Sequence, residues 1–382
     1  MNEINDLLKQ MVTAEGSDLH LKVGMPPIMR VDGSLKQMTR DRLSADSINQ
    51  MVFSILNEKQ KKEFTTHHEL DFAYGVPGVA RFRVNLCIQR GTIRVVMRIV
   101  PFDVKPFTDL NLPSDSLTYL CQRNNGLVLV TGPTGSGKST TLASMIDYIN
   151  ATRNCHIVTV EDPIEFLYRD NKCIITQREV GTDTDAFSTA LRHVLRQDPD
   201  VILIGEMRDL ETIGTALTAA ETGHLVFSTL HTTDAPGTID RIIDVFPPHQ
   251  QSQIRIQLAN ALQGVLCQKV LPLKTGQGRV PATEVMVATP RIKQLITEKA
   301  NHMTYYEAIL NSPEFLHMHT MNQDLVRLKK ADVITMEIAL ANSPNPDEFK
   351  LNLRGIYAGG TKDDMKGPPR DGKFDGRYSA PS

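Results

Sequence analysis

The chain of 382 residues has no tryptophan, and none of its five cysteines belongs to a Cys-x-x-Cys pair. We therefore expect neither a disulfide framework nor a structural zinc site. No apolar run reaches the roughly eighteen residues of a membrane span, and no positive stretch followed by an apolar one stands near Met1, so we expect a cytoplasmic protein without a transmembrane segment. The net charge of −2 argues against stable nucleic-acid binding, which depends on an excess of Lys and Arg.

What the chain does contain is a complete phosphate-binding pattern after the apolar run 127–130. The loop consists of Gly132, Pro133, Thr134, Gly135, Ser136, Gly137, Lys138, Ser139 and Thr140. Its glycines allow successive backbone amides to turn around a phosphate, and the helix expected from residue 140 points its N-terminus at the same place. Lys138 adds a positive charge, and the Ser139 hydroxyl can bind Mg²⁺. A chance glycine-rich turn would lack the flanking strand and helix, so the segment predicts a nucleoside triphosphate site.

The rest of the chain divides by pattern into two domains, a linker and a tail. Residues 1–100 are typical of a small α+β sensor-like domain, with helices expected at 1–12 and near 44–64 and strands at 18–23, 28–31, 70–74, 80–84 and 92–100. Three prolines predict an extended linker at 101–113. From 114 to 345 strands and helices alternate, as in a mostly parallel sheet covered by helices. Residues 346–382 are expected to form a tail that becomes poor in apolar residues and disordered.

Two acidic segments follow apolar strands downstream of the loop. The strand at 156–160 runs into Glu-Asp-Pro-Ile-Glu, which ends at Glu165, and the strand at 201–204 precedes Gly205 and Glu206. Ligands of open α/β sheets bind at the carboxyl ends of the strands, where we expect these carboxylates. Hydrolysis needs a carboxylate that orients the attacking water, for which Glu165 is our candidate, and Glu206 suits the magnesium side. The alternative for each is a solvated strand end.

Two histidines, His224 and His231, bracket the apolar strand at 225–230. Each could serve only in packing or hydrogen bonding, but their position on a strand near the loop favours a role in sensing the γ-phosphate. His302, His317 and His319 could be taken for a metal cluster. No acidic or cysteine partner stands at ligand spacing from them, so we expect no metal there.

Arginines concentrate in the first domain. Five lie within eighteen residues of strand-like sequence, namely Arg81, Arg83, Arg90, Arg94 and Arg98. Alternation along a strand places Arg81 and Arg83 on one face, and likewise Arg94 and Arg98. They form either a solvated basic face or arginine fingers that reach the triphosphate of a neighbouring subunit.

Together these segments resemble the type IV pilus retraction ATPases, the PilT/PilU group of the secretion ATPase superfamily. The resemblance covers residues 1 to about 345 and rests on 132–140, 160–166, 176–181, 195–206 and 222–232. These segments are similar to the family's Walker A loop, Asp box, Walker B segment and His box.

The resemblance assigns roles to single residues. Glu165 matches the family's catalytic glutamate, Glu206 its Walker B glutamate, and His224 and His231 its His-box pair. Relatives place inter-subunit arginines at positions that correspond to Arg83, Arg94 and Arg98.

The resemblance also implies a fold and an assembly. The fold class would be α/β, with a PAS-like α+β domain at 1–100 and a RecA-like P-loop ATPase domain at 114–345. The chain would bind ATP and Mg²⁺ and form a homo-hexamer in the cytoplasm. It would work peripherally at the inner membrane on a pilus platform protein, so that pilins return from the fibre to the membrane.

Two features bear on which member of this group the chain resembles. The tetracysteine zinc segment and the additional leading domain of pilus-assembly ATPases are missing, which favours retraction. Residues 290–298, Pro-Arg-Ile-Lys-Gln-Leu-Ile-Thr-Glu, match the Ala-Ile-Arg-Asn-Leu-Ile-Arg-Glu motif of PilT-type motors only in part. The alternative is therefore a PilU-type accessory paralogue that assists another retraction ATPase. A nucleic-acid translocase with a RecA-like core is a more distant alternative.

Overall fold

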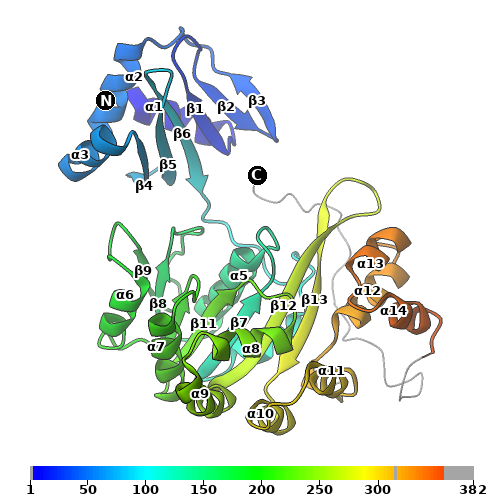
Figure 1. Ribbon diagram of the computed structural model, residues 1–382. Coiled ribbons are helices and arrows are strands. Elements are labelled where there is room, and N and C mark those ends of the chain that lie inside the picture. The colour runs from blue at the N-terminus through cyan, green and yellow to red at the C-terminus, as the bar shows by residue number, and fades with distance from the viewer. Residues whose placement is uncertain (1–2, 314–315, 357–382) are drawn as a thin grey trace. The chain divides into compact units, whose positions relative to one another are not determined.

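The protein is described here by a computed structural model that covers residues 3–313 and 316–356 and divides into two compact units (Figure 1). The first unit extends to Asp103 and includes Glu165–Leu167, and the second comprises Val104–Ile164 and continues from Tyr168. Within the described ranges, none of the helices combines the length and the apolar character needed to cross a membrane.

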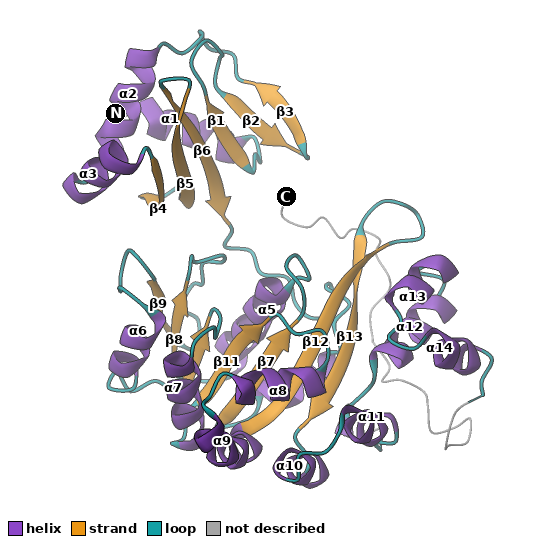
Figure 2. Ribbon diagram, viewed as in Figure 1, coloured by secondary structure: helices purple, strands orange, loops and turns teal. Residues whose placement is uncertain are grey.

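The first unit is an antiparallel sheet with helices packed on one face (Figure 2). Its elements are α1 (Glu3–Thr13), β1 (Asp18–Leu21), β2 (Ile28–Val31), β3 (Ser34–Gln37), α2 (Ala45–Ile55), α3 (Glu58–His67), β4 (Glu69–Val76), β5 (Ala80–Gln89) and β6 (Thr92–Val100). The strand order is β3-β2-β1-β6-β5-β4. Phe82, Val84 and Leu86 alternate along β5 and are buried with the apolar residues of α1 and α2. The arginines between them therefore lie on the other face of the sheet.

The stretch predicted as one helix near 44–64 forms two helices, because the chain is extended at Leu56 and a new helix begins after Asn57. The Asn57 side chain accepts a hydrogen bond from the Gln60 amide at 2.9 Å, and the Gln60 side chain accepts one from the Asn57 amide at 3.0 Å. This reciprocal cap stabilises a fresh N-terminus.

The second unit is built around a seven-stranded sheet of order β13-β12-β7-β11-β10-β8-β9. Its strands are β7 (Gly126–Thr131), β8 (His156–Glu161), β9 (Ile174–Glu179), β10 (Val201–Ile204), β11 (Leu225–Leu230), β12 (Leu262–Pro272) and β13 (Arg279–Val287). All neighbours are parallel except β12 and β13. The helices are α4 (Ser114–Cys121), α5 (Lys138–Thr152), α6 (Phe187–Val194), α7 (Leu210–Glu221), α8 (Ala235–Asp244), α9 (Pro248–Ala261), α10 (Pro290–Thr297), α11 (His302–Leu310), α12 (Met321–Lys330), α13 (Met336–Asn342) and α14 (Pro346–Leu353). The predicted α/β fold class, with a mostly parallel sheet in the larger unit, is confirmed.

The central strands of this sheet are buried on both faces and end at one common edge. Every residue of β7, β10 and β11 is buried, as expected for strands covered on both sides. The register pairs Thr131 with Leu230 and Ile204 with both Ser228 and Val160. The segments that follow β7, β8, β10 and β11 therefore leave the sheet at its carboxyl edge.

The segment predicted as an extended linker, 101–113, is only partly so. From Val104 it belongs to the second unit, and Phe107, Leu110 and Leu112 are buried in that unit's core. The prolines interrupt regular structure, but the apolar side chains near them still gain free energy by leaving water.

The prediction of a disordered tail from residue 346 is wrong for its first part. Asn345 caps α14, and Phe349 of this helix is fully buried against residues of α12, β12 and β13. The remainder of the predicted tail, 357–382, lies outside the described residues.

Candidate functional site

The phosphate loop joins β7 to α5 and places glycine where other residues would not fit. Gly132, Gly135 and Gly137 have φ values of 144°, 77° and 84°, a region that residues with a side chain rarely adopt. At Gly132 a Cβ atom would lie 2.2 Å from the backbone oxygen of Gln268 on β12. Gly137 is the N-cap of α5, and because it has no side chain, it leaves the positive end of the helix open to an anion.

Lys138 lies across this loop. Its Nζ donates hydrogen bonds to the carbonyl oxygens of Gly132 and Pro133 at 2.9 and 3.1 Å. A phosphate in the loop would offer the same ammonium group charged oxygens, which form stronger hydrogen bonds than neutral carbonyls. The loop therefore has the backbone, the helix end and the cation that polyphosphate binding needs.

Glu206 and His231 come together from neighbouring strands, because Glu206 follows β10 and His231 follows β11. Glu206 Oε2 lies 3.5 Å from His231 Nε2, and its Oε1 lies 2.6 Å from Arg208 Nε. The Glu206 side chain is mostly buried, with 16% of its surface exposed, whereas Arg208 is largely exposed. The parallel order of β10, β11 and β7 places this cluster on the same sheet edge as the phosphate loop.

His224 does not join that cluster within the chain. It precedes β11, a strand of six residues, which spans about 20 Å, so it lies at the opposite edge of the sheet from His231. There its Nδ1 is 2.9 Å from the carbonyl oxygen of Ala219 and 3.4 Å from Thr222 Oγ1. Of the two histidines, only His231 stands at the edge that carries the loop.

Glu165 and Arg83 form a surface pair. Glu165 groups with the first unit, where its Oε1 lies 3.4 Å from Arg83 Nη1. Both side chains are close to half exposed, and such ion pairs contribute little to stability. Either side chain can therefore exchange this partner for another at small cost.

Arg94 and Arg98 lie four residues apart on β6, on the sheet face that the helices of the first unit leave uncovered. Arg98 Nε donates to Asp18 Oδ1 at 2.7 Å, and the Asp18 side chain is only 2% exposed. Moving Arg98 to a phosphate would deprive a buried carboxylate of its nearer cation and leave it Arg30 at 3.9 Å, which is costly. Among the three predicted inter-subunit arginines, Arg83 and Arg94 therefore suit that role better than Arg98.

The predicted magnesium ligands are Ser139, the second residue of α5, and Glu206. No group of three or more His, Cys, Asp or Glu side chains able to hold a metal ion occurs within 3–313 and 316–356. Mg²⁺ in phosphate-transferring sites takes only one or two protein ligands and completes its shell with substrate oxygens and water. A hydroxyl and a carboxylate fit that chemistry.

His319, one of the three histidines considered above as a metal cluster, lies elsewhere. It is buried, with its Nε2 2.9 Å from Thr283 Oγ1.

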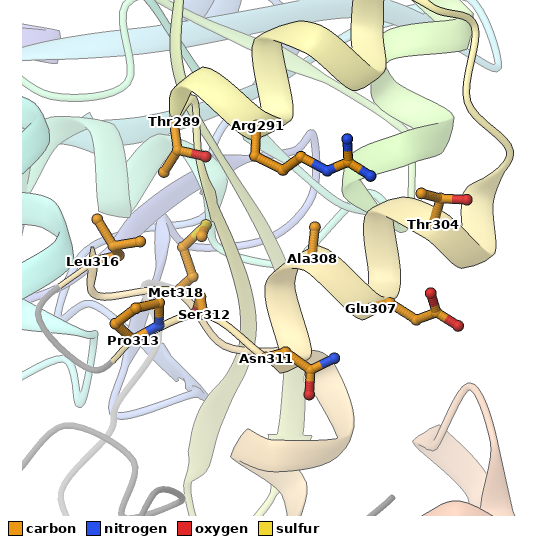
Figure 3. A pocket seen from close by; sticks show the side chains of 10 residues that line it. All are labelled: Thr289, Arg291, Thr304, Glu307, Ala308, Asn311, Ser312, Pro313, Leu316 and Met318. Atoms are coloured by element: carbon orange, nitrogen blue, oxygen red, sulfur yellow. The ribbon is translucent and has the colours of Figure 1, made fainter. Parts of the chain in front are cut away.

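A cavity of about 340 Å³ lies in another part of the second unit, between α10, α11 and the segment that follows α11 (Figure 3). Its lining residues are Thr289, Arg291, Thr304, Glu307, Ala308, Asn311, Ser312, Pro313, Leu316 and Met318. None of them belongs to the phosphate loop. This cavity therefore adds nothing to the nucleotide site.

Two residues at the site are not singled out by the sequence. Arg208 stands two residues after Glu206, and nothing in the local pattern distinguishes it from a surface arginine. Gln268 contacts the loop from 132 residues away in the sequence. Only the pairing of β12 with β7 brings it there.

Comparison with known proteins assigns this chain to a family of secretion proteins. The chain belongs to the family described as Type II/IV secretion system protein, which it matches over residues 1–333.

Three relatives illustrate the similarity. The chain is 46% identical to the type IV pilus retraction ATPase PilT of Pseudomonas aeruginosa, over 91% of this chain and 100% of the relative. It is 38% identical to the type IV pilus ATPase PilU of the same organism, over 92% of this chain and 91% of the relative. A crystal structure of the pilus retraction motor PilT with bound ADP superposes with a TM-score of 0.81 at 47% identity, covering 90% of this chain and 98% of that one.

Proposed function

We propose that this chain is the ATP-hydrolysing motor of type IV pilus retraction, the process that drives twitching motility. One observation carries the proposal. The phosphate loop and the Glu206–His231 pair lie at the same carboxyl edge of the larger sheet. The full-length similarity to PilT supports the same function.

Each residue has a role in the proposed reaction. The loop amides and Lys138 bind the β- and γ-phosphates. Ser139 and Glu206 would hold Mg²⁺, which would neutralise charge on the phosphate oxygens. Glu165 orients the attacking water and accepts its proton. His231, in contact with Glu206, responds when the γ-phosphate is lost.

The proposal includes an assembly. Arg83 and Arg94 would reach the triphosphate of a neighbouring subunit in a homo-hexamer, and such arginines raise rates by about 10³ to 10⁵ in other NTPases. Hydrolysis would then move one subunit against the next. In the cytoplasm, at the inner membrane, this motion would act on the pilus platform protein.

The PilU-type accessory role is the second candidate, and α10 favours it. Ile292, Leu295 and Ile296 form the buried face of this helix, whereas Gln294 and Thr297 are exposed. The partial match to the PilT-type motif therefore concerns a helix whose exposed face is open to partners.

Motility decides between the two roles. The gene for this chain would be expressed in a bacterium that has type IV pili but lacks its own retraction ATPases, beside a Lys138→Ala control. Twitching restored by the wild-type chain alone, and not by the control, is the expected result. Twitching restored only together with a second retraction ATPase would establish the accessory role instead.

A further inference from the structure

The phosphate loop begins against β12, a strand that the sequence places far from it. β12 runs parallel to β7 with Cys267 opposite Thr131, so Gln268 stands beside the point where the chain leaves β7. The close approach of Gly132 to the Gln268 backbone oxygen shows how tightly the loop is held there.

The side chain of Gln268 makes two further contacts with the same region. It is 3% exposed, its Nε2 donates to the Ser136 carbonyl oxygen at 2.6 Å, and its Oε1 accepts from Thr141 Oγ1 at 2.8 Å. A carboxamide can donate at one end and accept at the other without carrying a charge. Both hydrogen bonds are buried, so the loss of either would leave a polar atom with neither a protein partner nor water, which costs free energy.

We propose that Gln268 is a positioning residue that sets the direction of a phosphate-binding amide in the loop. The Ser136 carbonyl and the Gly137 N–H belong to one planar trans peptide unit, in which these two bonds point in opposite directions. Because Gln268 holds the Ser136 oxygen toward β12, the Gly137 N–H is turned away from β12, to the side where the phosphate binds. The hydrogen bond from Thr141 fixes which end of the carboxamide faces Ser136.

This inference rests on the proposed nucleotide site. It also explains how the loop is already arranged for a phosphate before a ligand binds. A loop that is already arranged loses less conformational entropy when a phosphate binds. Gln268 therefore acts on nucleotide affinity through the loop, without touching the nucleotide.

The test is equilibrium binding of ADP with Mg²⁺ to the purified full-length chain, compared with Gln268→Met and Gln268→Glu. Met has a similar length but neither donates nor accepts as the amide does, and an ionised Glu cannot donate to the Ser136 carbonyl. We expect about ten- to a hundredfold weaker binding in each variant. In ATP hydrolysis, KM should rise more than kcat falls. If Gln268 served only in packing, the substitutions would lower the melting temperature but leave the affinity for ADP unchanged at temperatures well below it. That result would overturn the proposal.

Gln268→Glu offers a second readout, because protonation gives its carboxyl a donor again. A buried carboxyl keeps its proton to higher pH than an exposed one. Relative to wild type at the same pH, binding by Gln268→Glu should recover between about pH 8 and about pH 5.5, whereas binding by Gln268→Met should not. Gln268 shares its face of the sheet with Thr283 on β13, which bonds Asp324 and His319, and Lys138 lies at the end of the loop. These charged and titratable groups are common to all three proteins, so the comparison with wild type and Gln268→Met corrects for their titration. Parallel pH profiles for the two variants would contradict the proposal.

Gln251→Met is the matched control, because Gln251 also donates to a backbone carbonyl, that of Phe246 at 3.0 Å, and lies outside the loop. The affinity of this control for ADP should equal that of wild type.

Should both Gln268 variants fail to fold, Thr141→Val tests the same arrangement by removing the hydroxyl that orients the amide. Unchanged affinity for ADP in Thr141→Val would count against the proposal. A wild-type chain that does not bind ADP would contradict the proposed function itself. Equal binding by wild type and the Gln268 variants would contradict only this inference.

Discussion

The Glu206 carboxylate contacts both of its neighbours in the cluster, and in the proposed mechanism these contacts respond to charge nearby. Arg208 lies 2.6 Å from one carboxylate oxygen and His231 lies 3.5 Å from the other. A magnesium ion or a phosphate nearby would compete with both contacts. In the proposed mechanism, loss of the γ-phosphate therefore changes the forces on the ends of β10 and β11 together.

Glu165→Gln should separate binding from chemistry. The amide cannot accept the proton of the attacking water, so we expect turnover to fall by about 10² to 10⁴. Affinity for ADP should stay close to that of wild type, since the loop is untouched. Steady-state ATPase assays and ADP titrations measure the two quantities, and a parallel loss of both would remove Glu165 from the catalytic role.

Glu284 on β13 predicts a dependence of stability on pH. Burial raises the pKa of this carboxyl to about 7, although the Ala235 N–H donates to it at 2.8 Å. Because the folded chain keeps this proton to higher pH than the unfolded chain, the stabilising contribution is complete below the ordinary pKa of 4.5 and is lost as the pH rises through about 7.

Glu284→Gln, which stays neutral at every pH, should therefore be more stable than wild type by about 3 kcal/mol at about pH 8 and nearly equal to it near pH 4.5. Urea unfolding at both pH values measures the difference. An advantage that is the same at both would mean that the carboxyl does not titrate in this range.

Among the helices, α14 tests whether the first part of the predicted tail is folded. Phe349 is fully buried in the cluster that joins α14 to α12 and the two long strands, so Phe349→Ala should cost about 3 to 5 kcal/mol of unfolding free energy. Leu351→Ala, on the same helix but 45% exposed, is the control and should cost far less. Denaturant unfolding that finds the two variants equally stable would show that α14 does not pack as described.

The elements that could be predicted are those whose own residues specify them. β7, β10 and β11 are continuous apolar runs, and the glycines, Lys138 and Ser139 specify the loop locally. β9 is mostly half-exposed, and the sequence gives it no such run. The Glu206–His231 contact depends on strand order, and the Gln268 contact depends on β12 lying beside β7. Neither can be derived from local pattern, because each joins residues far apart in the chain.

For the whole molecule, the proposed chemistry is distributed over two units and over neighbouring copies. The second unit carries the loop, Glu206 and His231, whereas Arg83 and Arg94 belong to the first unit. If those arginines act on a neighbour's triphosphate, an isolated subunit lacks part of its site. Activity should then depend on assembly as well as on the residues of one chain.

The most direct measurement is the rate of ATP hydrolysis per subunit, with Mg²⁺, across a range of protein concentrations for the wild-type chain and Lys138→Ala. The account predicts a wild-type rate that rises steeply as subunits assemble and a Lys138→Ala rate near zero throughout. A chain that binds ATP but leaves it intact at every concentration, or that hydrolyses it equally well without Lys138, would contradict the account.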